Sequence, residues 1–246
     1  MKFTAEKSQI VDSLQNAAAV AERRQTIPIL ANLRLKASSG KLEVTATDLE
    51  IQIKNYSDLL SIEEEGETTV SARKMSELCR SLPDAENVNF LLKDGKLTVS
   101  SKNFHGDFAT ISADDFPELE VNEEQKSTEI LSGVLKRILT KTSFSMASQD
   151  VRYYLNGLLL ELTEGEIKGV ATDGHRLAVS SSKAEGKGLE MRNILPRKAV
   201  LELAKLLPPE DTAIELLVGP TYFGVKTESL NFSSKLIDGK YPDYEK

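Results

Sequence analysis

The residues best placed to do chemistry lie in one short segment, VATDGHRLAV, at positions 170–179. This segment puts Asp173, His175 and Arg176 within four positions of one another. An oriented histidine commonly activates a nucleophile, so a hydrolase or transferase that uses Asp173 and His175 is one hypothesis. A second hypothesis is structural, because an Asp-Gly pair favours a tight turn capped by its own side chains. A third is a binding surface built on that turn.

Other motifs with a known chemistry are absent from the sequence. It contains no GxxxxGK[ST] phosphate loop and no GxSxG elbow, and the EGKGLE run at 185–190 does not fit a dinucleotide fingerprint. Two histidines, His105 and His175, and the single Cys79 are too few for a histidine or cysteine metal cluster or for a disulfide. We therefore expect no cofactor and no bound metal.

Composition limits the class of protein. An apolar content of 40% over 246 residues suffices for one or two domains with real cores. No apolar run reaches the ~18 residues of a membrane span, and the N-terminus lacks the apolar stretch of a signal peptide. We expect a cytoplasmic protein with no membrane partner. The net charge of −7 is unlike that of a typical nucleic-acid binder, although the local field matters more than the total.

The chain contains two copies of one pattern. ILANLRLKASSGKLEVTATD at 29–48 aligns with YLNGLLLELTEGEIKGVATD at 154–173, an offset of 125. Further matches follow in order, including DFPE at 115–118 with KYPD at 240–243. Several matches at a nearly constant offset indicate a duplicated domain rather than a short-period solenoid. We predict domains at 1–121 and 122–246, joined near an acidic segment.

Each copy has the same expected layout. A helix comes first, at 8–23 with Ser8 as its N-cap in copy one and at 132–147 in copy two. Strands follow, then a second helix at 71–82 or 196–207, and then more strands. Glycine-containing pairs such as Ser39-Gly40, Glu164-Gly165 and Asp94-Gly95 mark the hairpin turns. The pattern predicts an α+β domain with two helices and about eight short strands.

Cations recur on corresponding helices of the two copies, away from the apolar stripes. They are Arg73, Lys74 and Arg80 in copy one, and Lys136, Arg137, Lys141, Arg197, Lys198 and Lys205 in copy two. An ordinary solvated face explains any single helix. Repetition modestly favours a basic surface that contacts phosphates without reading base sequence. A single-strand binder is less favoured, because aromatic residues are few and tryptophan is absent.

The chain resembles the bacterial DNA polymerase III beta subunit family, the beta sliding clamps. The segments that carry the resemblance are MKFT at the start, TIPILANLRL at 26–35, TATDLE at 45–50, ARK at 72–74, DFP at 115–117, FSMASQDVRYYLNG at 144–157, VATDGHRLAV at 170–179, PRKAV at 196–200 and SKLIDGKYPDY at 234–244. The resemblance covers the whole chain, and the segments at 144–157 and 170–179 are the most specific.

The resemblance implies a non-catalytic bacterial processivity factor. Tandem clamp domains would place helices on a channel side and antiparallel sheets on the outer side. Three domains per subunit would pair head to tail into a homodimeric ring around duplex DNA, so a third domain is expected in the full-length protein. A groove would capture short peptide motifs of the replicative polymerase, the clamp loader and repair proteins.

The resemblance also assigns residues. It places Arg24, Gln149, Tyr153, Tyr154 and Arg197 toward DNA, and charge alone adds Arg73, Arg152 and Lys198. For the two tyrosines, simple packing within a strand is an equal alternative. The partner groove would comprise Leu155, Thr172, Gly174, His175, Arg176, Leu177, Pro242 and Lys246. Lys246 departs from the arginine common in the family, which keeps the charge but loses bidentate geometry.

Overall fold

The structure is a computed structural model that describes residues 1–21, 27–83, 86–119, 125–184, 189–209 and 212–245. The chain forms two compact units, Met1–Leu119 with Glu228–Asn231 and Glu120–Thr227 with Phe232–Lys246. The domain boundary predicted between residues 121 and 122 lies outside the described residues.

The first unit contains two helices and nine strands among the described residues. In chain order they are β1 (Lys2–Glu6), α1 (Lys7–Val20), β2 (Asn32–Ser38), β3 (Lys41–Thr47), β4 (Ile51–Asp58), β5 (Ser61–Glu64), β6 (Gly66–Ser71), α2 (Ala72–Ser81), β7 (Asn87–Lys93), β8 (Lys96–Ser100) and β9 (His105–Ile111). Two short 3-10 helices, η1 (Pro28–Ala31) and η2 (Ala113–Asp115), complete it.

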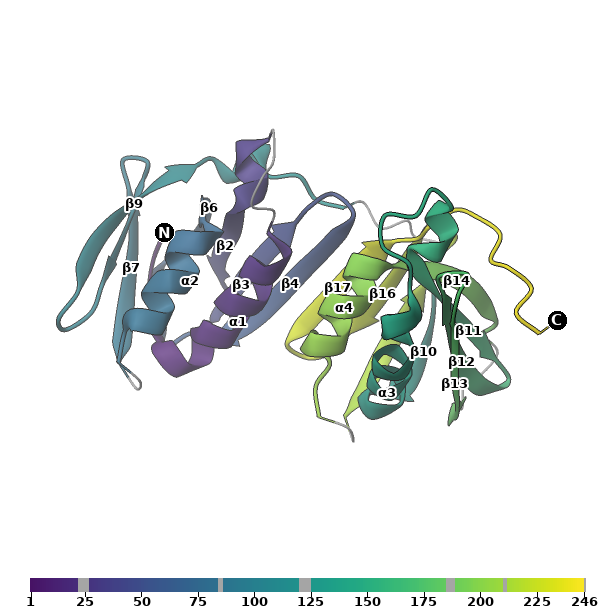
Figure 1. Ribbon diagram of the computed structural model, residues 1–246. Coiled ribbons are helices and arrows are strands. Elements are labelled where there is room, and N and C mark those ends of the chain that lie inside the picture. The colour runs from purple at the N-terminus through teal and green to yellow at the C-terminus, as the bar shows by residue number, and fades with distance from the viewer. Residues whose placement is uncertain (22–26, 84–85, 120–124, 185–188, 210–211, 246) are drawn as a thin grey trace. The chain divides into compact units, whose positions relative to one another are not determined.

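Antiparallel pairing orders the strands of the first unit as β4-β3-β2-β6-β9-β8-β7-β1-β5. Figure 1 shows α1 and α2 side by side over one face of these strands. Helix α1 buries Ile10, Leu14 and Ala17 completely, which is the spacing of one helix face. Helix α2 begins after Ser71, whose hydroxyl accepts a hydrogen bond from the Lys74 N–H. The hydrophobic core thus lies between the helix pair and the sheet.

The second unit repeats this plan. Its elements are β10 (Lys126–Leu131), α3 (Ser132–Thr142), β11 (Gly157–Thr163), β12 (Gly165–Thr172), β13 (Leu177–Ala184), β14 (Met191–Pro196), α4 (Arg197–Leu206), β15 (Ala213–Val218), β16 (Tyr222–Lys226) and β17 (Leu230–Lys235). The 3-10 helices η3 (Ser143–Ser145) and η4 (Tyr153–Leu155) lie between α3 and β11.

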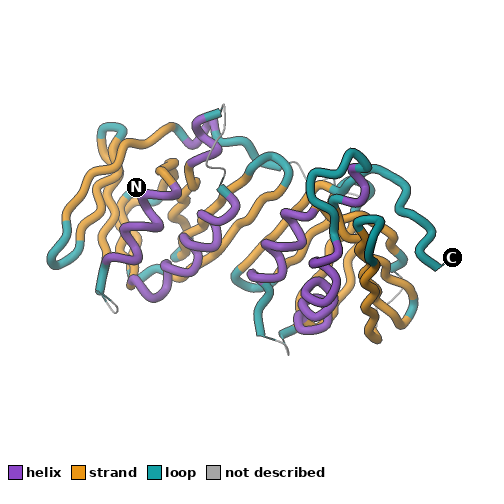
Figure 2. Tube along the Cα trace, in the orientation of Figure 1, coloured by secondary structure: helices purple, strands orange, loops and turns teal. Residues whose placement is uncertain are grey.

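Two sheets and two helices form the second unit. The strand order is β13-β12-β11-β14 in one sheet and β10-β15-β16-β17 in the other, with antiparallel pairing. Figure 2 shows the helices in purple and the strands in orange. Helix α3 packs closely on β12, where Gly169 lies under Ile138: a Cβ on Gly169 would come within 2.4 Å of the Ile138 Cγ2 atom. The glycine therefore sets how near this helix can approach its sheet.

The predicted α+β class with two helices and antiparallel strands per domain is confirmed, and three details are corrected. A strand, β1 or β10, precedes the first helix of each unit. Helix α1 begins at Lys7, so Ser8 is inside the helix and is not its N-cap. Tyr153 and Tyr154 lie in the 3-10 helix η4 rather than in a strand, because Leu155 N–H bonds back to the Arg152 carbonyl.

Candidate functional site

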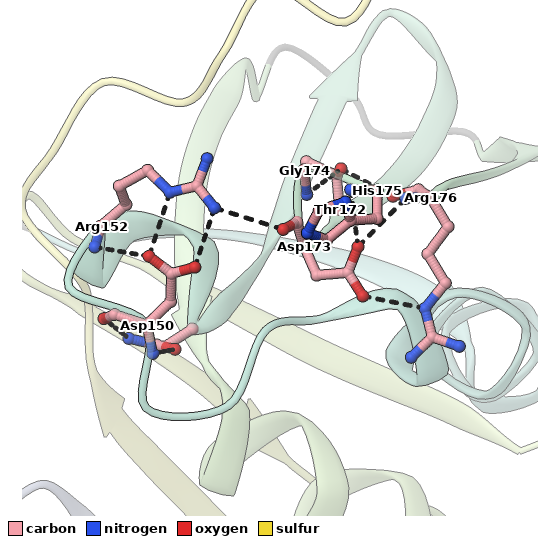
Figure 3. Close-up of polar contacts among 8 residues, drawn as sticks. Asp150, Arg152, Thr172, Asp173, Gly174, His175 and Arg176 are labelled. Atoms are coloured by element: carbon pink, nitrogen blue, oxygen red, sulfur yellow. Dashed lines mark hydrogen bonds and ion pairs between the residues drawn. The ribbon is translucent and has the colours of Figure 1, made fainter.

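The turn at residues 173–176 joins β12 to β13. It is stabilised by hydrogen bonds from the side chains of Asp173 and of the preceding Thr172 (Figure 3). The Asp173 Oδ1 atom accepts the N–H groups of His175 and Arg176, both at 3.0 Å. The Thr172 hydroxyl accepts the Gly174 N–H at 3.1 Å and donates to the Arg176 carbonyl at 2.7 Å. Gly174 has a φ of 88°, in the left-handed region that favours glycine. The tight-turn hypothesis is therefore confirmed.

These contacts leave Asp173 poorly placed for catalysis. Its Oδ2 atom accepts Arg176 Nε at 3.0 Å. The backbone hydrogen bond from His175 is the main cause that lowers the Asp173 pKa, and Arg176 adds to it. Among the described residues, no hydrogen bond joins the His175 ring to Asp173 or to a nucleophile. The carboxylate thus stabilises a turn, and it does not orient the imidazole.

A pocket of about 300 Å³ lies beside this turn. Its lining consists of Arg152, Tyr154, Leu155, Thr172, Gly174, Leu177, Pro242, Asp243 and Tyr244. The residues come from η4, from the end of β12, from the start of β13 and from the C-terminal segment. Five of the predicted groove residues are thereby brought together: Leu155, Thr172, Gly174, Leu177 and Pro242.

Two predicted groove residues have other surroundings. His175 and Arg176 are exposed and do not line the pocket, and the Arg176 guanidinium lies 5.6 Å from the centre of the Phe144 ring. Lys246 lies outside the described residues. Asp243 and Tyr244 line the pocket although the sequence did not single them out. Their position directly after Pro242 is the signal that could have identified them.

Arg152 was predicted to contact DNA, but the structure places its side chain at the pocket. Asp150 holds it through Nε–Oδ1 at 3.0 Å and Nη2–Oδ2 at 2.8 Å, and Nη2 also reaches the Asp173 carbonyl at 3.3 Å (Figure 3). This ion pair lowers the pKa of Asp150 to about 2. A Cβ on Gly174 would lie 3.1 Å from the guanidinium nitrogens of Arg152. Glycine at position 174 thus leaves room for the arginine.

Hydrogen bonds link the two ends of the segment that carries Arg152 and Tyr154. The Asn156 side chain accepts the Asp150 N–H at 2.9 Å and donates to the Asp150 carbonyl at 2.8 Å. Arg197 at the start of α4 donates from its backbone to the Asn156 carbonyl and from Nη1 to the Met146 carbonyl. The opposite wall is anchored by Tyr241, whose hydroxyl accepts the Thr172 N–H at 3.0 Å. Burial raises the pKa of Tyr241 to about 12, so this acceptor is a neutral phenol.

The remaining DNA candidates lie on several elements. Arg73 is exposed on α2 and forms an ion pair with Glu77. Arg197 and Lys198 open α4 and are partly exposed. Gln149 is exposed on the loop before η4, and Tyr153 is exposed within η4, where its ring packs edge-on against Tyr154. Arg24 lies outside the described residues.

Neither a metal cluster nor a membrane helix is found in the part of the chain that the structure describes. No group of three or more His, Cys, Asp or Glu side chains there could hold an ion. No helix there is long and apolar enough to cross a membrane.

Comparison with known proteins identifies the family. The model of the DNA polymerase III beta subunit N-terminal domain matches residues 1–120, and that of the central domain matches residues 129–243. The chain belongs to the DNA polymerase III beta subunit family. This family consists of non-catalytic sliding clamps, so the chain is a sliding-clamp chain and not a hydrolase or transferase. Identity is 40% to the beta sliding clamp of Pseudomonas aeruginosa and 38% to that of Escherichia coli K12, covering 100% of this chain and 67% of each relative.

Solved clamps share the fold. A crystal structure of a Pseudomonas aeruginosa sliding clamp bound to griselimycin superposes with a TM-score of 0.96 at 41% identity, covering 100% of this chain and 67% of that one. The sliding clamp of Bacillus subtilis superposes with a TM-score of 0.92 at 28% identity, covering 99% of this chain and 66% of that one. The clamp fold expected from the sequence is therefore confirmed over essentially the whole chain.

Proposed function

We propose that the pocket beside the 173–176 turn captures short peptide segments of proteins that the clamp tethers to DNA. The observation that carries this proposal is the pocket itself, which gathers five residues from distant parts of the sequence. Its volume of about 300 Å³ suits one or two apolar side chains rather than a folded domain. A Pseudomonas aeruginosa relative binds griselimycin, and we propose that the same pocket binds it here.

The chemistry of the pocket fits a peptide with an apolar anchor. Leu155, Leu177 and Pro242 supply apolar surface, and burying a leucine-sized side chain there contributes on the order of 2 kcal/mol. Glycine at position 174 lets a peptide backbone approach the turn closely. Arg152 adds a cation whose guanidinium is fixed in place by Asp150. We propose Arg152 and Tyr154 as pocket residues in addition to those predicted.

The partners follow from this proposal. They are the replicative DNA polymerase, the clamp loader and repair proteins, each presenting a short motif. We also propose that a subunit carrying a third clamp domain pairs head to tail into a homodimeric ring around duplex DNA. The domains of this chain, 1–121 and 122–246, would be the first two of the three.

Phosphate contacts inside such a ring would be weak and independent of base sequence. We propose that the predicted DNA residues contribute to them: Arg24, Arg73, Gln149, Arg152, Tyr153, Tyr154, Arg197 and Lys198. A hollow of about 620 Å³ between α1 and α2 supports this, because small residues such as Ala18 and Ala19 line it together with Arg73 and Arg80. Glu77, the ion-pair partner of Arg73, also lines it. Small side chains allow the phosphate backbone of DNA to approach the helices closely, and the arginines supply positive charge.

The proposal is tested by titrating the chain with griselimycin in a calorimeter. Leu177→Asp puts a charge on the pocket wall and is expected to weaken binding at least ~10-fold, equivalent to ~1.4 kcal/mol. Leu60→Asp in the first unit is the matched control, because Leu60 is 50% exposed and Leu177 is 49% exposed. The control is expected to bind as the wild type does. Equal affinity of both variants, or no binding by the wild type, would contradict the proposed pocket.

A further inference from the structure

The first unit contains a turn built in the same way as the one beside the pocket. It follows β3, at positions 125 residues earlier in the chain. The Asp48 Oδ1 atom accepts the N–H groups of Glu50 and Ile51 at 2.9 and 2.7 Å. The Thr47 hydroxyl accepts the Leu49 N–H at 3.0 Å and donates to the Ile51 carbonyl at 2.8 Å. The four hydrogen bonds match those made by Thr172 and Asp173 in the second unit.

One position distinguishes the two turns. Leu49 stands where the second unit has Gly174, and both are left-handed, with φ of 73° and 88°. A leucine adopts this conformation only where its surroundings stabilise it. Leu49 is partly buried and packs against a cluster of Ile29, Leu30 and Phe116.

That cluster corresponds to the floor of the pocket in the second unit. At the offset of 125, Ile29 and Leu30 match Tyr154 and Leu155, two residues that line the pocket. Phe116 matches Tyr241, which anchors the pocket wall through Thr172. The side chain of Leu49 therefore covers the first unit's counterpart of the pocket floor. In the second unit the Arg152 guanidinium lies next to Gly174, and the pocket remains beside it.

We propose that Leu49 occupies the first unit's counterpart of the peptide pocket, and that the residue at positions 49 and 174 determines which duplicated domain admits a partner side chain. The inference rests on the proposed function for its biological meaning. The ligand class is a leucine-like aliphatic side chain on a peptide, because a leucine of the chain already fills the first site.

The two units also differ at the position that Leu177 occupies in the second. The Gln52 side chain accepts the Leu119 N–H at 3.0 Å, and Leu119 is buried. At the matching position the second unit has Leu177, which is half exposed and lines the pocket. Removing Leu49 would open the space that its own side chain fills on the cluster, so a single capped leucine is the appropriate probe.

The test uses N-acetyl-leucinamide and methyl NMR spectra of the whole chain. In the wild type, the probe is expected to shift the methyl signals of Leu155 and Leu177 but not those of Ile29 and Leu30. Leu49→Gly is expected to add saturable shifts at Ile29 and Leu30. Leu49→Asn is a second variant, because asparagine tolerates the left-handed region and is too polar to cover the cluster. Gly174→Leu is the reciprocal variant. It is expected to weaken the affinity for the probe, measured from the shifts at Leu155 and Leu177, at least ~10-fold.

The outcomes separate this inference from the proposed function. Absence of new shifts at Ile29 and Leu30 in the folded Leu49 variants overturns the inference, whatever happens in the second unit. Probe-induced shifts at those residues in the wild type also overturn it. A wild type that shows no response at Leu155 and Leu177 counts against the proposed pocket, whereas new shifts in the Leu49 variants still show that Leu49 covers a site.

Discussion

At the scale of single residues, positions 49 and 174 show how one side chain changes what an identical turn can do. A left-handed backbone at a leucine costs about 1–2 kcal/mol, whereas glycine adopts it freely. Burying a leucine fully contributes about 1.5–3 kcal/mol. Leu49 is partly buried, so its packing on Ile29 and Leu30 offsets part of the strain. Gly174 avoids the strain and leaves room for the Arg152 guanidinium at the edge of the pocket.

The ion pair between Asp150 and Arg152 gives a prediction at this scale. The pKa of Asp150, about 2, lies below that of an aspartate in the unfolded chain. The ionised Asp150 therefore stabilises the fold above a pH of about 4, and this stabilisation is lost as the pH falls toward 2. Arg152→Ala removes the main cause of the low pKa and is expected to raise it by about one pH unit or more. Carboxyl ¹³C shifts followed during acidification measure the change.

Arg176→Ala is the control for this experiment. Arg176 bonds to Asp173 and is not among the causes of the low Asp150 pKa, so the Asp150 titration is expected to stay near 2 in that variant. An unchanged Asp150 titration in Arg152→Ala would show that Arg152 is not fixed by this carboxylate in solution.

Some of the site could be read from the sequence, and some of it could not. The Asp173-Gly174 pair predicts its turn, because the side chain and the glycine act within four residues. The position of Arg152 depends on long-range packing, since its guanidinium reaches the Asp173 carbonyl across 21 residues of sequence. Charge alone predicted a DNA contact for Arg152, which stays a prediction, and it could not show that the side chain lies at the pocket.

At the scale of elements, helix positions followed from apolar spacing, but the leading strands did not. Leu135, Ile138 and Leu139 on α3 form a fully buried stripe that the sequence pattern predicts. Strand β1 is five residues long and is defined by pairing with β7, some 85 residues later. Local patterns contain little information about such a partner.

The packing of α3 on β12 gives a prediction at this scale. On the strand, Gly169 takes the position of Val44 in the first unit, and on the helix Ile138 takes that of Ser13. The larger residue of this contact is thus on the strand in the first unit and on the helix in the second. Gly169→Ala is expected to destabilise the fold by about 1–3 kcal/mol through overpacking. Urea unfolding followed by circular dichroism measures the loss.

A double-mutant cycle with Ile138→Ala supplies the control. The smaller side chain makes room for the added methyl group, so the double variant is expected to be more stable than the sum of the single effects predicts. Strictly additive effects would mean that the contact between Gly169 and Ile138 does not set the spacing of α3 on its sheet.

At the scale of the whole molecule, the question is how an acidic chain can serve on DNA. The net charge is −7, yet the chain belongs to a family of DNA sliding clamps. In the proposed ring, retention on DNA comes from encirclement, and phosphate contacts need only be weak. The chain spans 67% of the length of its curated relatives. We therefore propose to test ring closure on a subunit that carries three clamp domains.

The most direct test of encirclement compares circular and linear DNA. A full-length subunit is loaded onto a nicked circular plasmid by a clamp loader, and the bound fraction is followed before and after one restriction cut. The account predicts long retention on the circle and loss at least ~10-fold faster after linearisation, because a closed ring slides off free ends. Equal retention on the two forms would contradict it, since the protein would then hold DNA by contact rather than by topology.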